Sequence, residues 1–168
     1  NIRYIIAKSM IFYEKNDLIK FSELMSRAIE LEPDNPELYF NLGYAHQAMK
    51  KYYKSLEFYK KSLQLDSTYA KSLSNITNLI FGDIVPLIKE EQNKITGYSK
   101  ADEDKYDELR ETIRDYHIEA VSYFERIMKV IPDQKINAIK SLIEVYRYLD
   151  IQEREEFYMN LLEKNSAN

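Results

Sequence analysis

Residues 36–69 read PELYFNLGYAHQAMKKYYKSLEFYKKSLQLDSTY, and this stretch predicts two amphipathic helices joined by a short turn. The first helix begins at Pro36, where the missing N–H costs nothing, and its apolar residues recur three and four positions apart as far as Met49. The second helix covers about Tyr53–Leu65. Gly43 lies within the first helix, and because it has no side chain it allows the second helix to approach closely.

This arrangement resembles the tetratricopeptide repeat (TPR), a 34-residue helix-turn-helix unit with the pattern W-x2-L-G-x2-Y, then A-x3-F, then P. The matching positions are Tyr39, Leu42, Gly43, His46, Ser55, Tyr59, Ser62 and Ser67. Each departure from the family residue is close in size or a known variant. The resemblance implies an all-α fold, a right-handed α-solenoid of stacked TPR helix-turn-helix repeats.

Further copies of the unit occupy the rest of the chain. Pro33 precedes Ser67 by 34 residues, and the last copy is degenerate, as expected of a terminal repeat. We therefore predict a single TPR domain over residues 1–168, with repeats at about 2–35, 36–69, 70–134 and 135–168. The final LEKNSAN is expected to fray. Because the sequence begins at Asn1, inside an amphipathic segment, we expect the domain to be a fragment of a longer chain.

The third copy carries about 31 inserted residues, because its second-helix pattern appears 65 rather than 34 residues after that of the central copy. Helical periodicity continues on both sides of a polar turn at Thr96–Ala101, which predicts an elongated hairpin instead of a long loop. Ser99 or Asp102 is placed to cap the returning helix, and Pro86 and Gly82 are expected to kink or break the outgoing one. The region resembles bacterial TPR proteins with an extended helical hairpin in the penultimate repeat.

Composition excludes several classes of function. Of the 168 residues 45% are hydrophobic, which is ample for a core. The net charge of −4 with interleaved signs argues against a nucleic-acid surface. No apolar run reaches the roughly 18 residues of a membrane span, so direct membrane insertion is not expected. The absence of Cys fits the cytoplasm and equally the periplasm or cell envelope, and the compartment stays open.

Signals for catalysis are also missing. The chain has no P-loop, no Gly-rich nucleotide turn and no H-E-x-x-H motif. Its two histidines, His46 and His117, fall in different repeats and are interpreted as packing residues. The acidic run at residues 102–108 lacks the glycine and the ligand spacing of a calcium loop. We therefore predict no enzyme, no catalytic residue, no cofactor and no metal site.

The candidate binding surface is the concave face that the first helices of stacked repeats form. Its aromatic side chains are suited to bury apolar groups of a peptide, and its amides to hydrogen-bond an extended backbone. Asn is a poor helix former, so its placement in the middle of helices favours a functional role. The predicted partner-binding residues are Met10, Tyr13, Phe40, Asn41, Tyr44, Lys71, Asn75 and Asn78. We predict a non-catalytic protein–protein interaction module that binds a peptide or protein segment there.

The resemblance raises a more specific idea, the clamp by which some TPR domains hold the acidic C-terminus of chaperones. Asn41 and Lys71 stand at clamp positions. The other matching places hold Ile6, Met10 and Asn75, so two basic residues and one Asn of the clamp are missing. Binding of chaperone tails is therefore not expected.

Two other functions stay open. One is a structural scaffold that self-associates as a homo-oligomer through apolar ends, such as the face of Ile2, Ile5 and Ile6. The other is an accessory solenoid that serves a larger enzyme or sensor. A further alternative concerns the concave face itself: Phe40 and Met10 only pack between helices, or the extended hairpin folds against the groove.

Overall fold

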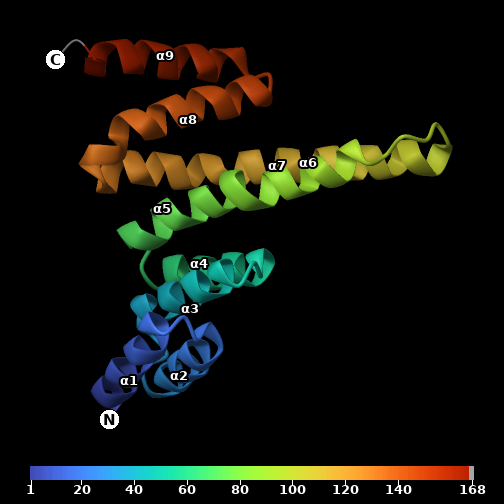
Figure 1. Ribbon diagram of the computed structural model, residues 1–168. Helices are drawn as coiled ribbons and strands as arrows, with labels where there is room; N and C mark the ends of the chain where they lie inside the picture. The colour runs from blue at the N-terminus through green and yellow to red at the C-terminus, as the bar shows by residue number, and fades with distance from the viewer. Residues whose placement is uncertain (167–168) are drawn as a thin grey trace. The chain divides into compact units, whose positions relative to one another are not determined.

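The computed structural model describes residues 1–166, and this part of the chain is helical and contains no strand (Figure 1). The expected all-α class is confirmed. The helices divide into two compact units, Asn1–Leu79 and Ile80–Asn168, each with its own core. The assignment of residues 1–168 to a single domain stays a prediction.

Unit 1 consists of helical hairpins in which each helix packs against the next one along the chain. Its helices are α1 (Ile2–Glu14), α2 (Leu18–Leu31), α3 (Pro36–Ala48), α4 (Tyr52–Leu65) and α5 (Ala70–Leu79). Pro36 opens α3 behind Asn35, whose side chain accepts a hydrogen bond from the Glu37 N–H. The core between α2 and α3 is formed by Phe21, Met25, Ala28, Leu38, Leu42 and Ala45.

The turns within the regular hairpins share one backbone geometry. Asn16, Lys50 and Asp150 each follow a first helix and take a left-handed φ of 57° to 58°. After α3, the Lys51 N–H donates to the His46 carbonyl at 2.8 Å and the Lys50 N–H donates to the Gln47 carbonyl at 2.8 Å. This is the Schellman pattern, which satisfies the last carbonyls of a helix and reverses the chain.

Close packing of α3 and α4 depends on Gly43, as predicted. A Cβ built at Gly43 would lie 2.6 Å from the Tyr59 ring, well inside van der Waals contact. The Ser55 hydroxyl donates to the Gly43 carbonyl at 2.7 Å in the same buried region. Small residues at positions 43 and 55 therefore let a buried aromatic ring fill the space between the two helices.

Unit 2 contains the elongated hairpin. Its elements are η1 (Ile80–Ile84, a π-helix), α6 (Val85–Asn93), α7 (Lys100–Val130), η2 (Pro132–Gln134), α8 (Lys135–Tyr148) and α9 (Gln152–Ser166). α7 has 31 residues against 14 in α4, which makes it about 25 Å longer at 1.5 Å per residue. α6 packs along α7, and Figure 1 shows the tip of this hairpin projecting beyond α8 and α9 of the same unit.

The outgoing arm of the hairpin differs in detail from the expectation. Pro86 and Gly82 were expected to kink or break the helix, and the chain passes through a π-helix, Ile80–Ile84, which contains Gly82 and ends two residues before Pro86. Pro86 has no N–H to offer the carbonyl four residues earlier, so a local change of hydrogen-bond register accommodates it. The helical stretch thus continues where a regular repeat would turn.

Two boundary predictions are wrong. The turn at the hairpin tip lies at residues 94–99, because Ser99 caps α7 and Lys100 is already helical. The final segment does not fray from residue 162, since α9 extends to Ser166. The last two residues of the predicted tail, Ala167 and Asn168, lie outside the described part of the chain.

Candidate peptide-binding pocket

A pocket of about 230 Å³ opens on unit 1 where the first helices of the first two repeats meet. We call it the aromatic pocket, and it is lined by Met10, Tyr13, Phe21, Phe40, Asn41 and Tyr44. α1 supplies the first two residues, α2 supplies Phe21, and α3 supplies the last three. Five of the eight predicted partner-binding residues therefore come together around one cavity.

The rings around the pocket form a connected series. The Tyr13 centroid lies 5.5 Å from that of Phe21 and 6.0 Å from that of Tyr44. Phe40 lies 6.4 Å from Tyr44 and 5.9 Å from the buried Tyr59 ring. Tilted pairs at these separations are favourable and fix ring orientation, so the apolar wall of the pocket is built in advance of any ligand.

The polar groups at the pocket are few. A hydrogen bond with Tyr44, followed by burial, raises the pKa of Tyr13 above its usual value, so the hydroxyl stays protonated at neutral pH. Tyr44 itself is 41% exposed. Within residues 1–166, no hydrogen bond engages the Asn41 side chain, which lines the pocket. A ligand would thus meet an apolar floor with one amide and two phenols at its edge.

Lys71 borders the pocket through Phe40. Its ammonium lies 5.7 Å from the Phe40 centroid and 3.3 Å from a Glu37 carboxylate oxygen, with both charged side chains exposed. Exposed pairs of this kind contribute little to stability. Lys71 is therefore held over the aromatic wall, and its charge is partly balanced before any ligand arrives.

Asn75 corrects part of the sequence argument, which assumed that core packing does not need it. The Asn75 amide donates to the Tyr59 hydroxyl at 3.3 Å, and that hydroxyl donates to the Gln47 side chain at 3.0 Å. Asn75 thus helps to satisfy a polar atom of a buried ring. Asn78, one turn further along α5, is exposed and does not line the pocket.

Phe21 is the pocket residue that sequence reasoning missed. It aligns with Ser55 of the central repeat, a position of the second helix, whereas the predicted binding face was built from first helices alone. Ser9 stands where the central repeat has Gly43, and it is completely buried. The second repeat thus pairs two small residues, Gly43 and Ser55, whereas the first pairs Ser9 with the large Phe21. This exchange was the sequence signal that could have assigned Phe21 to the pocket.

The two histidines pack as predicted. His46 stacks on Phe58 with the ring centroids 5.1 Å apart, and burial lowers its pKa. His117 stacks on Tyr148 at 3.8 Å, its Nδ1 lies 2.7 Å from the Ile113 carbonyl oxygen, and burial again lowers its pKa. Neither histidine lines the aromatic pocket.

The structure also bears on metal sites and membrane spans. Among the described residues, no three His, Cys, Asp or Glu side chains gather in a way that could hold a metal ion. Over the same residues, no helix is both long enough and apolar enough to cross a bilayer.

The helical hairpins, the left-handed turns and the glycine contact define a helical-repeat protein. The family model for the tetratricopeptide repeat matches residues 36–69, and a second family model, described as TPR repeat, matches residues 11–50. Residues 11–69 of the chain are thus tetratricopeptide repeats.

Solved structures show the same fold at low sequence identity. The chain is similar to MamA, with a TM-score of 0.60, 14% identity, and coverage of 99% of this chain and 81% of that one. It is similar to the first TPR of Spaghetti (RPAP3), solved with the HSP90 peptide SRMEEVD, with a TM-score of 0.54, 15% identity, and coverage of 89% and 95%. It is also similar to the P58(IPK) TPR domain, with a TM-score of 0.50, 15% identity, and coverage of 100% of this chain and 58% of that one. A search of curated protein sequences gave no match.

Proposed function

We propose that the chain binds an extended segment of a partner protein at the aromatic pocket of unit 1. The observation that carries the proposal is the pocket itself, in which five side chains predicted from the sequence surround one apolar cavity. The general role of a protein-interaction module is what the TPR fold supports. What we propose beyond that role is the location of the binding site and the chemistry of the segment that it binds.

The lining determines the kind of segment that fits. An apolar side chain of the partner enters between Met10, Tyr13 and Phe40, where it is removed from water. The Asn41 amide offers both a donor and an acceptor, which matches the backbone of an extended peptide. Tyr44 covers the bound segment from the exposed rim.

One structural relative supports the proposal at the level of the fold. The first TPR of Spaghetti was solved with a bound heptapeptide, so the same helical arrangement accommodates a peptide in that protein. The peptide in that structure ends in acidic residues. The residues that line the aromatic pocket include no Lys or Arg, and we propose an apolar rather than an acidic anchor.

The test uses the 168-residue chain and a displayed library of random peptides. A selected peptide is then titrated against Tyr44→Ala and Asn41→Ala by calorimetry. Each change is expected to weaken binding by about 1–2 kcal/mol, roughly five- to thirtyfold, because each removes a side chain that contacts the bound segment. Thermal unfolding of the Tyr44→Ala variant should change little, since the Tyr44 ring is partly exposed.

Two variants serve as matched controls. Tyr53→Ala removes another exposed tyrosine of unit 1, and Asn137→Ala removes an exposed asparagine of α8, and neither residue lines the pocket. Both should bind the peptide as tightly as the parent chain. Equal affinity of the parent, Tyr44→Ala and Asn41→Ala proteins would show that the aromatic pocket is not the binding site.

A further inference from the structure

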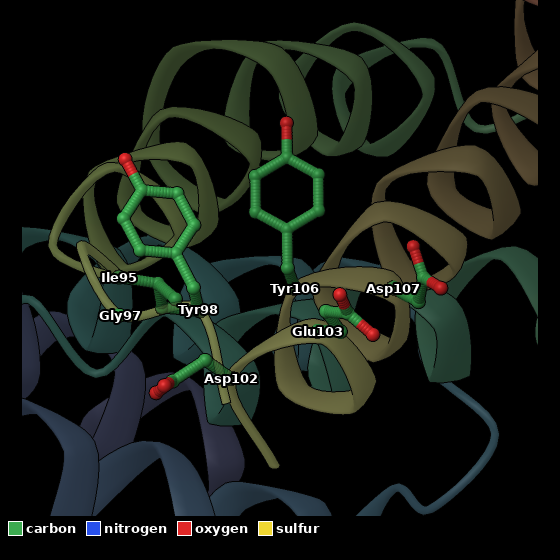
Figure 2. Close-up of a pocket in the computed structure, with 7 residues that line it drawn as sticks. All are labelled: Ile95, Gly97, Tyr98, Asp102, Glu103, Tyr106 and Asp107. Atoms are coloured by element: carbon green, nitrogen blue, oxygen red, sulfur yellow. The ribbon is translucent and has the colours of Figure 1, made fainter. Parts of the chain in front are cut away.

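The tip of the elongated hairpin carries a second pocket, far along the sequence from the aromatic pocket and within unit 2. It has a volume of about 260 Å³ and is lined by Ile95, Gly97, Tyr98, Asp102, Glu103, Tyr106 and Asp107 (Figure 2). The first three residues belong to the loop between α6 and α7, and the other four belong to the first turns of α7. Nothing in the proposed function uses these side chains.

The loop at the tip is fixed by local contacts. Ser99 and Asp102 form a reciprocal capping box, in which the Asp102 carboxylate accepts from the Ser99 N–H at 3.1 Å and from its hydroxyl at 2.6 Å. A Cβ on Gly97 would collide with that carboxylate, so the loop backbone folds closely over the start of α7. Gln92 of α6 donates to the Tyr106 carbonyl and ties the two arms together. The pocket is therefore preorganised.

Two tyrosines dominate this surface, and we call them the tyrosine pair. Tyr98 is 97% exposed and Tyr106 is 44% exposed. Figure 2 shows their rings projecting in the same direction, one from the loop and one from α7. An aromatic ring left in water at a rigid loop tip contributes no packing to the fold. Exposed tyrosines are enriched where a protein contacts another protein, because the ring gives a large contact area at low entropic cost.

The charges around the tyrosine pair are unbalanced. Residues 94–108 contain five carboxylates and three lysines. Each lysine already pairs with a carboxylate that does not line the pocket: Lys94 with Glu90, Lys100 with Asp104 and Lys105 with Glu108. Of the lining carboxylates, Asp102 is engaged in the cap and Asp107 pairs with Arg110 at 3.2 Å. Within the described chain, neither an ion pair nor a hydrogen bond engages the Glu103 carboxylate.

The positions of these groups on α7 bring them to one side. Glu103 precedes Tyr106 by three residues and Asp107 by four, so the three side chains share a helix face. The available carboxylate therefore lies beside an exposed aromatic ring. A planar cation can stack on the ring and at the same time donate two parallel hydrogen bonds to the carboxylate oxygens, and guanidinium is the biological group with both properties.

We propose that the hairpin tip binds an arginine side chain of a partner protein, with the guanidinium stacked on the tyrosine pair and paired with Glu103. The aromatic faces attract the cation through their quadrupole. Glu103 supplies the negative charge, because the nearby lysines pair with other carboxylates. Arginine is favoured over lysine because an ammonium lacks the plane for stacking and the fork for bidentate pairing.

The test is a site-resolved NMR titration of the ¹⁵N-labelled 168-residue chain. The probe is an N-acetylated, C-amidated hexapeptide of alternating Gly and Arg, compared with the same peptide containing Lys or Glu. The arginine peptide should shift the amide signals of residues 95–107 saturably, and the lysine peptide should bind about fivefold more weakly. Tyr98→Ala and Glu103→Gln should each weaken binding of the arginine peptide by about fivefold.

The matched controls separate a built site from general attraction to an acidic chain. Tyr53→Ala and Glu57→Gln remove an exposed tyrosine and an exposed carboxylate of α4 in unit 1, and they should leave the titration unchanged. An equal loss in Glu57→Gln and Glu103→Gln would overturn the proposal, because binding would then be diffuse. So would an unchanged affinity in Tyr98→Ala, equal binding of the lysine peptide, or an absence of saturable shifts at residues 95–107. None of these readouts involves the aromatic pocket, so failure here and failure of the proposed function are distinct.

Discussion

The second and third repeats differ at the position that follows the first helix of a regular repeat. In the second repeat the chain turns there, and in the third it continues as a helix. Lys50 takes a left-handed φ of 58° and ends the first helix of its repeat. Ile84, 34 residues later, is helical and leads straight into α6. A β-branched residue strongly disfavours the left-handed region, and Ile84 is moreover completely buried in unit 2. The residue at this position therefore favours a turn in the second repeat and a continuing helix in the third.

The two repeats also use glycine differently. Gly43 faces the Tyr59 ring at a distance that leaves no room for a Cβ, whereas a Cβ on Gly82 would meet no atom within 4 Å. Neither glycine takes a positive φ. Packing between helices requires a glycine at position 43. At position 82 no contact requires one, and a larger residue would fit.

The largest expected effect follows from the glycine contact. Gly43→Leu should lower the free energy of unfolding by about 1–3 kcal/mol or more, because the new side chain must displace the Tyr59 ring from a filled space. Urea unfolding followed by circular dichroism measures the change. Gly82→Leu is the matched control and should have a much smaller effect. Equal unfolding midpoints for Gly43→Leu and the parent would contradict the close approach of α3 and α4.

The turn itself is tested by transferring the residue type of the third repeat into the second. Lys50→Ile should destabilise the protein by about 1 kcal/mol, because isoleucine resists the left-handed φ that Lys50 adopts. Lys51→Ile places the same side chain at a φ of −91° and provides the control. The two urea midpoints should differ in favour of the Lys51 variant, and an opposite order would remove the backbone explanation for the elongated hairpin.

The open space at Gly82 gives a prediction of opposite sign. Gly82→Ala should raise the free energy of unfolding by about 0.5–1 kcal/mol, because alanine restricts the unfolded chain and meets no obstacle in the folded one. Thermal unfolding of the variant shows the gain as a higher midpoint. A lower midpoint would mean that the π-helix depends on glycine at this position.

The smallest effect concerns pH and the two buried histidines. Burial lowers the pKa of His46 in the second repeat and of His117 in the third below the usual value near 6.5. The unfolded chain therefore binds more protons in acid, and the folded state should lose stability as the pH falls below about 6.5. His46→Gln and His117→Gln should each reduce this dependence of the urea midpoint on pH. An NMR titration that finds either imidazole protonating at or above pH 6.5 would exclude the mechanism.

The features that the sequence predicted correctly are those that local pattern determines. The 34-residue spacing, the glycine contact and the inserted hairpin all follow from periodicity or from a residue type at a fixed position. Ser99 and Asp102 were the two cap residues predicted on the same grounds, and Ser99 is the N-cap. Helix propensity and capping act over three or four residues, so they are visible in the chain itself.

The features that escaped prediction depend on contacts between residues distant in sequence. Phe21 reaches the aromatic pocket because the first repeat places a large ring opposite a buried serine. Asn75 bonds to Tyr59, sixteen residues away, and this contact follows from the packing of α5 on α4. Such outcomes depend on the three-dimensional neighbourhood, which periodicity does not specify.

Tyr59 gives unit 1 a particular way of unfolding. Its ring fills the gap left by Gly43, and its hydroxyl links Gln47 of α3 to Asn75 of α5. In repeat proteins, stability is the sum of terms within repeats and terms between neighbours, and the second kind makes the array cooperative. A side chain of the second repeat that hydrogen-bonds the first helix of the third contributes to both. Loss of that hydroxyl would therefore let α5 fray before its neighbours and broaden the transition, so Tyr59 determines how sharply unit 1 melts as well as how stable it is.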